Sequence, residues 1–141
     1  MNCSVSELKE LLGQYEHILL TAHVNPDGDA VGALAATGGM LRAWGKQADD
    51  VDDKFDFLPG IRTVYKPDDV KTDASWLTLI LDATGVDRIG KTAELIHGPL
   101  VNIDHHISNA HFADAEYIRP DYAATGEVLT DLFTQWGCAI T

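Results

Sequence analysis

Three short, largely apolar runs constrain the fold of this chain more than any other feature: residues 17–22 (HILLTA), 76–81 (WLTLIL) and 100–103 (LVNI). Runs of this length without regular polar alternation are typical of strands buried on both faces, as in a parallel sheet. Segments with helical periodicity surround them at residues 4–15, 30–44 and 123–136. The alternation predicts an α/β domain with a mostly parallel sheet flanked by helices.

Cap, turn and glycine signals refine this outline. The first helix should begin at a capping box, because Ser4 and Glu7 have the required spacing. A further strand is expected near residues 54–57, and the acidic stretch at residues 49–53 is interpreted as a solvated edge. Gly38 and Gly39 lie inside the second helix, where each costs roughly 1 kcal/mol of helix propensity, so we expect another backbone to pack closely there.

Length and charge bound what the chain can be. Its 141 residues correspond to one domain with a real hydrophobic core. The 22 acidic and 10 basic residues give a formal charge of −12, so a large basic surface for nucleic acid is not expected. Cys3 and Cys138 lie near opposite ends without CxxC spacing, which favours a reducing compartment. The N-terminus has neither a signal-peptide pattern nor a membrane span, so a cytoplasmic protein is expected.

Ionisable residues follow the end of each of the three predicted strands: His23, Asp27 and Asp29 after the first, Asp82 after the second, and Asp104, His105 and His106 after the third. Because the carboxyl ends of parallel strands share one edge of a sheet, these side chains can meet in space. Imidazoles and carboxylates are ligands of divalent ions such as manganese, and a carboxylate between two ions can bridge them. The pattern therefore predicts a divalent-metal site that could hold two ions.

Each of these residues also has a purely structural explanation. Asp27 or Asp29 can cap the following helix, Asp82 can satisfy a turn, and His105 can form a hydrogen bond within the core. Accumulation of such residues at three separate strand ends favours the metal site over these explanations taken together.

The same residues resemble the motifs of a known family. The segment 23–32 (HVNPDGDAVG), Asp82 and the Asp104-His105-His106 triplet are similar, in order and spacing, to motifs I, II and III of the DHH phosphoesterases. The resemblance implies a hydrolase of phosphate esters with the N-terminal DHH fold. A family II-like inorganic pyrophosphatase, whose motif I is similar, and a non-catalytic metal- or nucleotide-binding module are the alternatives.

Smaller segments are most similar to the nanoRNase and pAp-phosphatase branch, the bifunctional oligoribonucleases: NPDGDA, Phe57-Leu-Pro59, Asp87-Arg-Ile-Gly90, Ser108-Asn109 and Thr125-Gly126-Glu127. That branch trims very short oligoribonucleotides and removes the 3'-phosphate of 3'-phosphoadenosine 5'-phosphate. The resemblance thus implies short RNA or a nucleotide phosphate as substrate.

The resemblance also implies roles for the individual residues. His23 and Asp27 would bind one manganese ion, Asp29 and His105 the other, and Asp82 would bridge both; Mg²⁺ or Co²⁺ could replace manganese. Asp82 and His106 would form the catalytic set, with His106 contacting the scissile phosphate or, in the alternative, orienting His105. Hydrolysis would use a water activated between the two ions.

Two features of the family are not found in the sequence: a fourth motif with a further aspartate, and a glycine-rich, histidine-containing motif in a C-terminal domain. Asp121 and Asp131 lie in the second half of the chain, where the fourth motif is expected, but the residues around them do not match that motif. We therefore expect residues 1–141 to be a partial DHH catalytic domain, truncated at the C-terminus, without the substrate-binding domain and weakly active or inactive alone. A truncated core could expose an apolar patch, so a homodimer is among the expectations.

Overall fold

The structure is a computed structural model that describes residues 3–23, 28–51 and 64–137. Its elements in chain order are α1 (Val5–Gly13), β1 (His17–Ala22), α2 (Gly28–Ala43), β2 (Gln47–Val51), β3 (Val64–Tyr65), the 3-10 helix η1 (Pro67–Asp69), β4 (Trp76–Leu81), the 3-10 segment η2 (Val86–Leu95), β5 (Leu100–Asp104), β6 (Ala115–Ile118) and α3 (Thr125–Gln135). The strands form one sheet in the order β3-β2-β1-β4-β5-β6, and each pairing between these strands is parallel. The predicted α/β class is confirmed.

The elements expected from the three apolar runs and the helical segments are all present. Helices α1 and α3 are shorter than expected, and α2 begins two residues earlier and ends one residue earlier than expected. The capping box also forms, since the Ser4 hydroxyl accepts from the Glu7 amide at 3.1 Å and the Glu7 carboxylate accepts from the Ser4 amide at 2.9 Å. None of the described helices is long and apolar enough to cross a bilayer.

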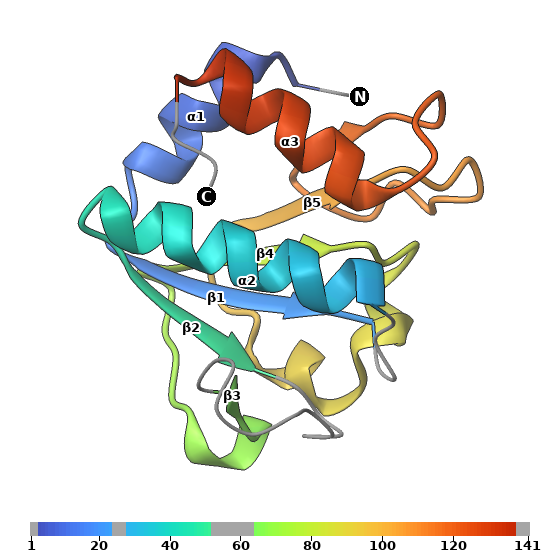
Figure 1. Ribbon diagram of the computed structural model, residues 1–141. Helices are drawn as coiled ribbons and strands as arrows, with labels where there is room; N and C mark the ends of the chain where they lie inside the picture. Colours follow the sequence, from blue (N-terminus) through green and yellow to red (C-terminus); the bar gives the residue numbers. More distant parts are fainter. Residues whose placement is uncertain (1–2, 24–27, 52–63, 138–141) are drawn as a thin grey trace.

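The two faces of the sheet are covered by different elements. The helices α1, α2 and α3 lie on one face, as Figure 1 shows, and the core there includes Leu77, Leu79 and Leu81 of β4. The intervening Ile80 belongs to a second, smaller core with Ile89 of η2 on the opposite face. Because successive strand side chains point to opposite faces, burial on both sides explains why this run has no polar alternation.

The strand order reverses direction between β1 and β4. The chain leaves β1 through α2 toward β2 and β3, then returns to β4 on the other side of β1 before continuing through η2 to β5. The crossovers α2 and η2 therefore contact opposite faces. In α/β sheets the carboxyl ends at such a reversal open a crevice in which ligands bind. His23 and Asp82 directly follow the two strands that border it.

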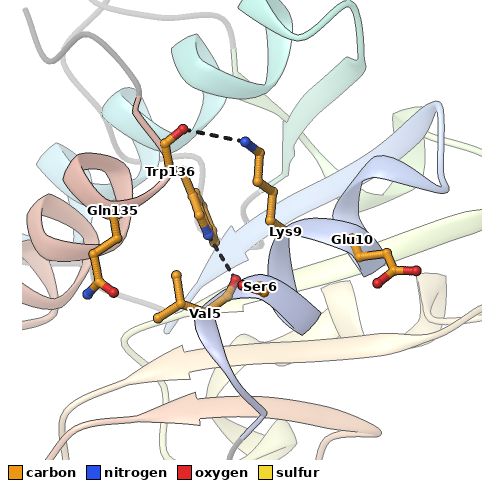
Figure 2. A pocket seen from close by; sticks show the side chains of 6 residues that line it. All are labelled: Val5, Ser6, Lys9, Glu10, Gln135 and Trp136. Carbon is orange, nitrogen blue, oxygen red and sulfur yellow. Dashed lines mark hydrogen bonds between the residues drawn. The ribbon is translucent and has the colours of Figure 1, made fainter.

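Helices α1 and α3 contact each other far from this crevice. The Trp136 indole donates to the Val5 carbonyl at 2.9 Å, and the Lys9 ammonium donates to the Trp136 carbonyl at 3.4 Å (Figure 2). A shallow pocket lies here, lined by Val5, Ser6, Lys9, Glu10, Gln135 and Trp136. Trp136 follows the last residue of α3, whereas the first residue of α3 contacts Asp82, so the pocket and the crevice lie at opposite ends of the helix.

Some local expectations differ from the structure. The strand expected at 54–57 lies outside the described residues, and β2 comes earlier, with Asp49 of the acidic stretch paired in register with Leu19 of β1. Ala48 and Val51 are buried while Asp49 is half-buried, so Asp49 is not the fully solvated residue that the acidic stretch predicted. No pattern in the sequence predicted β3, η2 or β6. The strand β3 has only two residues, and polar residues interrupt η2 and β6.

The expectation of a close backbone neighbour at Gly38 and Gly39 was wrong. The atoms nearest to a Cβ at Gly38 are those of the Arg42 guanidinium, with Nη1 at 3.1 Å, and that guanidinium donates to the Ala48 carbonyl. A Cβ at Gly39 would meet nothing within 4 Å in the described part of the chain. Gly38 thus leaves room for the Arg42 side chain of its own helix. No contact among the described residues requires a glycine at position 39.

Candidate metal centre

Asp82, the residue directly after β4, is central to the candidate site. It is only 3% exposed, and its backbone is left-handed with φ 58°. Aspartate tolerates this conformation better than most residues other than glycine. Its amide donates to the Ile103 carbonyl at 2.9 Å, which ties the turn to the neighbouring strand β5. The carboxylate is therefore held in a defined place at the carboxyl edge of the sheet.

The two carboxylate oxygens of Asp82 face histidines from two different loops. His23 Nε2 lies 3.5 Å from Oδ2, and His105 Nε2 lies 3.6 Å from Oδ1. Atoms that bind one ion at about 2.1 Å lie roughly 3–3.5 Å from each other, so the His23 distance falls at the upper end of the range for ligands of one ion and the His105 distance just above it. They are longer than the 2.7–2.9 Å typical of a charge-assisted hydrogen bond. A carboxylate that bridges two ions would have this arrangement.

Thr125, the first residue of α3, holds one of these oxygens. Its hydroxyl donates to Asp82 Oδ1 at 2.9 Å, and its side chain is wholly buried. A hydroxyl at a helix start usually caps the helix, but the N-cap of α3 is Ala124, without a side-chain hydrogen bond. Sequence reasoning quoted Thr125 within a family segment and assigned it no role. That segment and its place near the start of the helix predicted at 123–136 were the two available signals.

The third strand end adds two stacked imidazoles and a buried carboxylate. The rings of His105 and His106 lie 4.1 Å apart, and His106 Nδ1 is 2.7 Å from Asp104 Oδ1. Asp104 is wholly buried, and its other oxygen accepts from Asn109 Nδ2 at 2.9 Å. Both Asp104 oxygens are therefore hydrogen bonded to side chains of the same loop.

The described residues contain one close group of potential ligand atoms at this edge. One atom each from Asp82, Asp104, His105 and His106 lie within 4.8 Å of one another, and His23 approaches Asp82 from β1. Imidazole nitrogens and carboxylate oxygens suit Mn²⁺ and similar ions. The chemistry of this donor set therefore fits the divalent metal expected from the sequence.

The other predicted ligands are only partly located. Asp27 lies outside the described residues. Asp29 lies in the first turn of α2, which follows the loop after β1, and its side chain is not among those described. The structure thus brings His23, Asp82, His105 and His106 together, and the roles of all six predicted site residues stay predictions.

The two other carboxylates considered in the second half of the chain have partners of their own. The Arg119 guanidinium donates to both oxygens of Asp121, at 3.0 and 2.7 Å, and holds the pKa of Asp121 below its usual range. Asp131 accepts from the Tyr122 hydroxyl at 2.9 Å, and this bond raises the pKa of Tyr122. Neither carboxylate belongs to the close group of ligand atoms.

Comparison with known proteins decides the family. The model of the DHH family, N-terminal domain, matches residues 17–139. The chain belongs to the DHH family. Membership in this family confirms the resemblance that the three motifs carry. The matched region begins at the first residue of β1 and includes every residue of the candidate site.

Curated relatives of this DHH chain include proteins of the predicted branch. The bifunctional oligoribonuclease and PAP phosphatase NrnA of Thermus thermophilus is 33% identical over 122 residues, covering 85% of this chain and 37% of that protein. NrnA of Bacillus subtilis is 24% identical over 137 residues, covering 92% of this chain and 42% of that protein. The DHH chain therefore spans about two fifths of the length of these relatives.

A solved structure has the same fold. It is an exopolyphosphatase-related protein from Bacteroides fragilis, which matches with a TM-score of 0.79 and 21% identity, over 94% of this chain and 43% of that one. At this identity the likeness concerns the DHH fold alone.

Proposed function

We propose that this chain is the metal-binding catalytic domain of a phosphoesterase that hydrolyses short oligoribonucleotides, 3'-phosphoadenosine 5'-phosphate, or both. The observation that carries the proposal is the placement of the two Asp82 oxygens against His23 and His105. The printed activities of the NrnA relatives supply the substrate class. The chain spans only part of those proteins, so their activity is a proposal for this chain.

In this proposal His23 and Asp27 would hold one ion, Asp29 and His105 would hold the other, and Asp82 would be a ligand of both. Two manganese ions, when bound, would supply an activated water and neutralise charge that develops on the phosphate. Three aspartates contribute about −3 and two divalent ions about +4, so the loaded site could attract an anion although the chain carries a net charge of −12. Thr125 keeps Asp82 in place through its hydroxyl.

His106 is proposed to contact the scissile phosphate. Its side chain is 41% exposed against 19% for His105, so it is the more accessible of the two stacked rings. Its Nδ1 is engaged with Asp104 at 2.7 Å, which leaves Nε2 for the substrate. When the ring is protonated, both nitrogens are donors, and Nε2 can donate to a phosphate oxygen while Nδ1 stays bound to Asp104.

Metal binding provides the first test. The metal-free chain is titrated calorimetrically with Mn²⁺ and compared with Asp82→Asn, which keeps the side-chain shape and tolerates the left-handed backbone. Loss of an outer partner typically costs about 10–100-fold in affinity, so loss of the bridging carboxylate should cost at least about 100-fold. Asp68→Asn, which removes the same charge from an exposed position in η1, is the matched control and should bind like the wild type.

The result can also contradict the proposal. No Mn²⁺ binding by the wild type, or equal binding by wild type and Asp82→Asn, would mean that the site is structural. A ligand present at about 100 times its dissociation constant stabilises a fold by about 2.7 kcal/mol. Thermal unfolding with and without Mn²⁺ therefore gives an independent reading, and only wild type and Asp68→Asn should be stabilised.

Turnover is tested separately on the manganese-loaded chain. It is incubated with 3'-phosphoadenosine 5'-phosphate, with a 5'-phosphorylated diribonucleotide and with pyrophosphate, and the products are separated by chromatography. Release of AMP and phosphate, or of mononucleotides, supports the proposal. Cleavage of pyrophosphate alone would favour a pyrophosphatase. Because residues 1–141 are expected to be weakly active or inactive alone, metal binding without turnover would favour a binding module only if a version extended past Thr141 also gives no turnover.

A further inference from the structure

Asn109 has every polar atom of its side chain engaged, in the loop that follows His105 and His106. It is 6% exposed, and its Nδ2 donates to Asp104 Oδ2 at 2.9 Å and to Asn102 Oδ1 at 2.8 Å. Its Oδ1 accepts from the His111 amide at 2.8 Å. A buried amide with this many partners is held in one orientation.

The partners also fix which end of the amide faces Asp104. The His111 backbone N–H can only donate, so the oxygen of Asn109 must lie on that side. The two hydrogens on Nδ2 are then directed at Asp104 and Asn102, both of which offer oxygens. Asp104 therefore receives a hydrogen bond on Oδ2, and its Oδ1 is left to accept another. The atom opposite Oδ1 is Nδ1 of His106, at 2.7 Å.

Asn102 connects this arrangement to the turn that contains Asp82. It is wholly buried in β5, and its Nδ2 donates to the Ile80 carbonyl at 3.0 Å and to the Ala83 carbonyl at 3.3 Å. These carbonyls lie on either side of Asp82 in sequence. The two asparagines thus join the left-handed turn at Asp82 to the Asp104 and His106 pair across neighbouring strands.

We propose that Asn109, supported by Asn102, is a positioning residue for His106. It holds Asp104 as a hydrogen-bond acceptor for Nδ1–H of His106, so that Nε2 is the ring nitrogen directed to a substrate phosphate. The part about substrate rests on the proposed function. The part about the ring, that Nδ1 of His106 carries the proton, is independent of metal and substrate.

The neutral tautomer of His106 gives a direct test. In the ¹⁵N-labelled, metal-free chain at about pH 8.5, where ordinary imidazoles are neutral, long-range proton–nitrogen correlations distinguish Nδ1–H from Nε2–H. Free histidine favours the Nε2–H form. We expect His106 to be mainly Nδ1–H in the wild type. An Nε2–H majority in the unmutated chain overturns the proposal without any variant.

A variant separates positioning from general stability. Asn109→Leu keeps the approximate shape but removes the amide, and it should lower the Nδ1–H to Nε2–H ratio by about threefold to tenfold, as expected when a net hydrogen-bond contribution is lost. Ser108→Ala, at the exposed neighbouring position, is the control and should leave the ratio unchanged. A Leu variant that loses stability while the tautomer ratio stays constant would make Asn109 merely structural and refute the proposal.

Calorimetric Mn²⁺ titration of the same samples distinguishes the two proposals. If the wild type does not bind Mn²⁺ but the tautomer ratio changes in Asn109→Leu, the proposed function fails and the positioning of His106 stands. If Mn²⁺ binds and the ratio does not change, the positioning role fails while the metal site stands. Should Asn109→Leu not fold, an Nε2–H majority in the wild type would still overturn the proposal.

Discussion

Replacing Thr125 with valine removes the hydroxyl that donates to Asp82 and leaves a side chain of nearly the same shape. The bond is 2.9 Å long, and both residues are buried, with exposures of 0% and 3%. A hydrogen bond to a charged group contributes about 1.5–3 kcal/mol net, and a buried acceptor that loses its donor is not compensated by water. Thr125→Val should therefore lower the free energy of unfolding by about 1.5–3 kcal/mol.

The assay is urea unfolding of the metal-free chain, followed by far-ultraviolet circular dichroism in the presence of a chelator. Thr130→Val is the matched control, because Thr130 lies on the same helix and its exposed hydroxyl donates to the Gly126 carbonyl at 2.8 Å. That exposed bond within the helix competes with water, so its loss should change stability by less than about 0.5 kcal/mol. If both variants unfold at the same urea concentration as the wild type, Thr125 does not hold Asp82 and the reasoning is refuted.

Three further predictions concern the fold itself. Gly98→Ala should destabilise the chain by about 3 kcal/mol, because its Cβ would overlap the Trp76 carbonyl oxygen. Gly39→Ala should stabilise it by about 1 kcal/mol, because its Cβ would meet no described atom within 4 Å. Urea midpoints that move in the reverse order would contradict both. The hydrogen bonds from Ser4 hold the pKa of Glu7 below its usual range, so their contribution is present above the ordinary glutamate pKa and is lost as the pH falls through the lowered value. Urea unfolding at about pH 7 and pH 3 should therefore show a smaller acid loss in Glu7→Gln than in the wild type, and equal losses would count against the capping box.

Local patterns predicted the elements whose burial is complete. The runs that became β1 and β4 have five consecutive buried residues each, so their uninterrupted apolar sequences were enough to predict buried strands. The strands β2 and β6 escaped prediction because polar residues interrupt them. Glu116, for example, lies buried inside β6, where its carboxylate is 2.9 Å from His111 Nδ1. Such a partner five residues away in an irregular loop leaves no periodic signal.

Residue chemistry and position at strand ends predicted much of the candidate site. His23, Asp82, His105 and His106 were selected because ionisable side chains follow three buried strands, and the structure brings these four together. Thr125 and Asn109 were assigned no role, because hydroxyls and amides satisfy local backbone groups in most turns and helix starts. Only the partners they contact distinguish them from such residues.

The sequence by itself determined that this chain forms an α/β domain and that its ligand-type residues gather at strand ends, because both follow from local periodicity and side-chain chemistry. The tertiary structure decided the neighbour relations. Placing β4 between β1 and β5 sets one Asp82 oxygen toward His23 and the other toward His105. The same order lets Asn102 reach the carbonyls of the Asp82 turn. Strand order is a property of packing between distant segments, so no local pattern contains it.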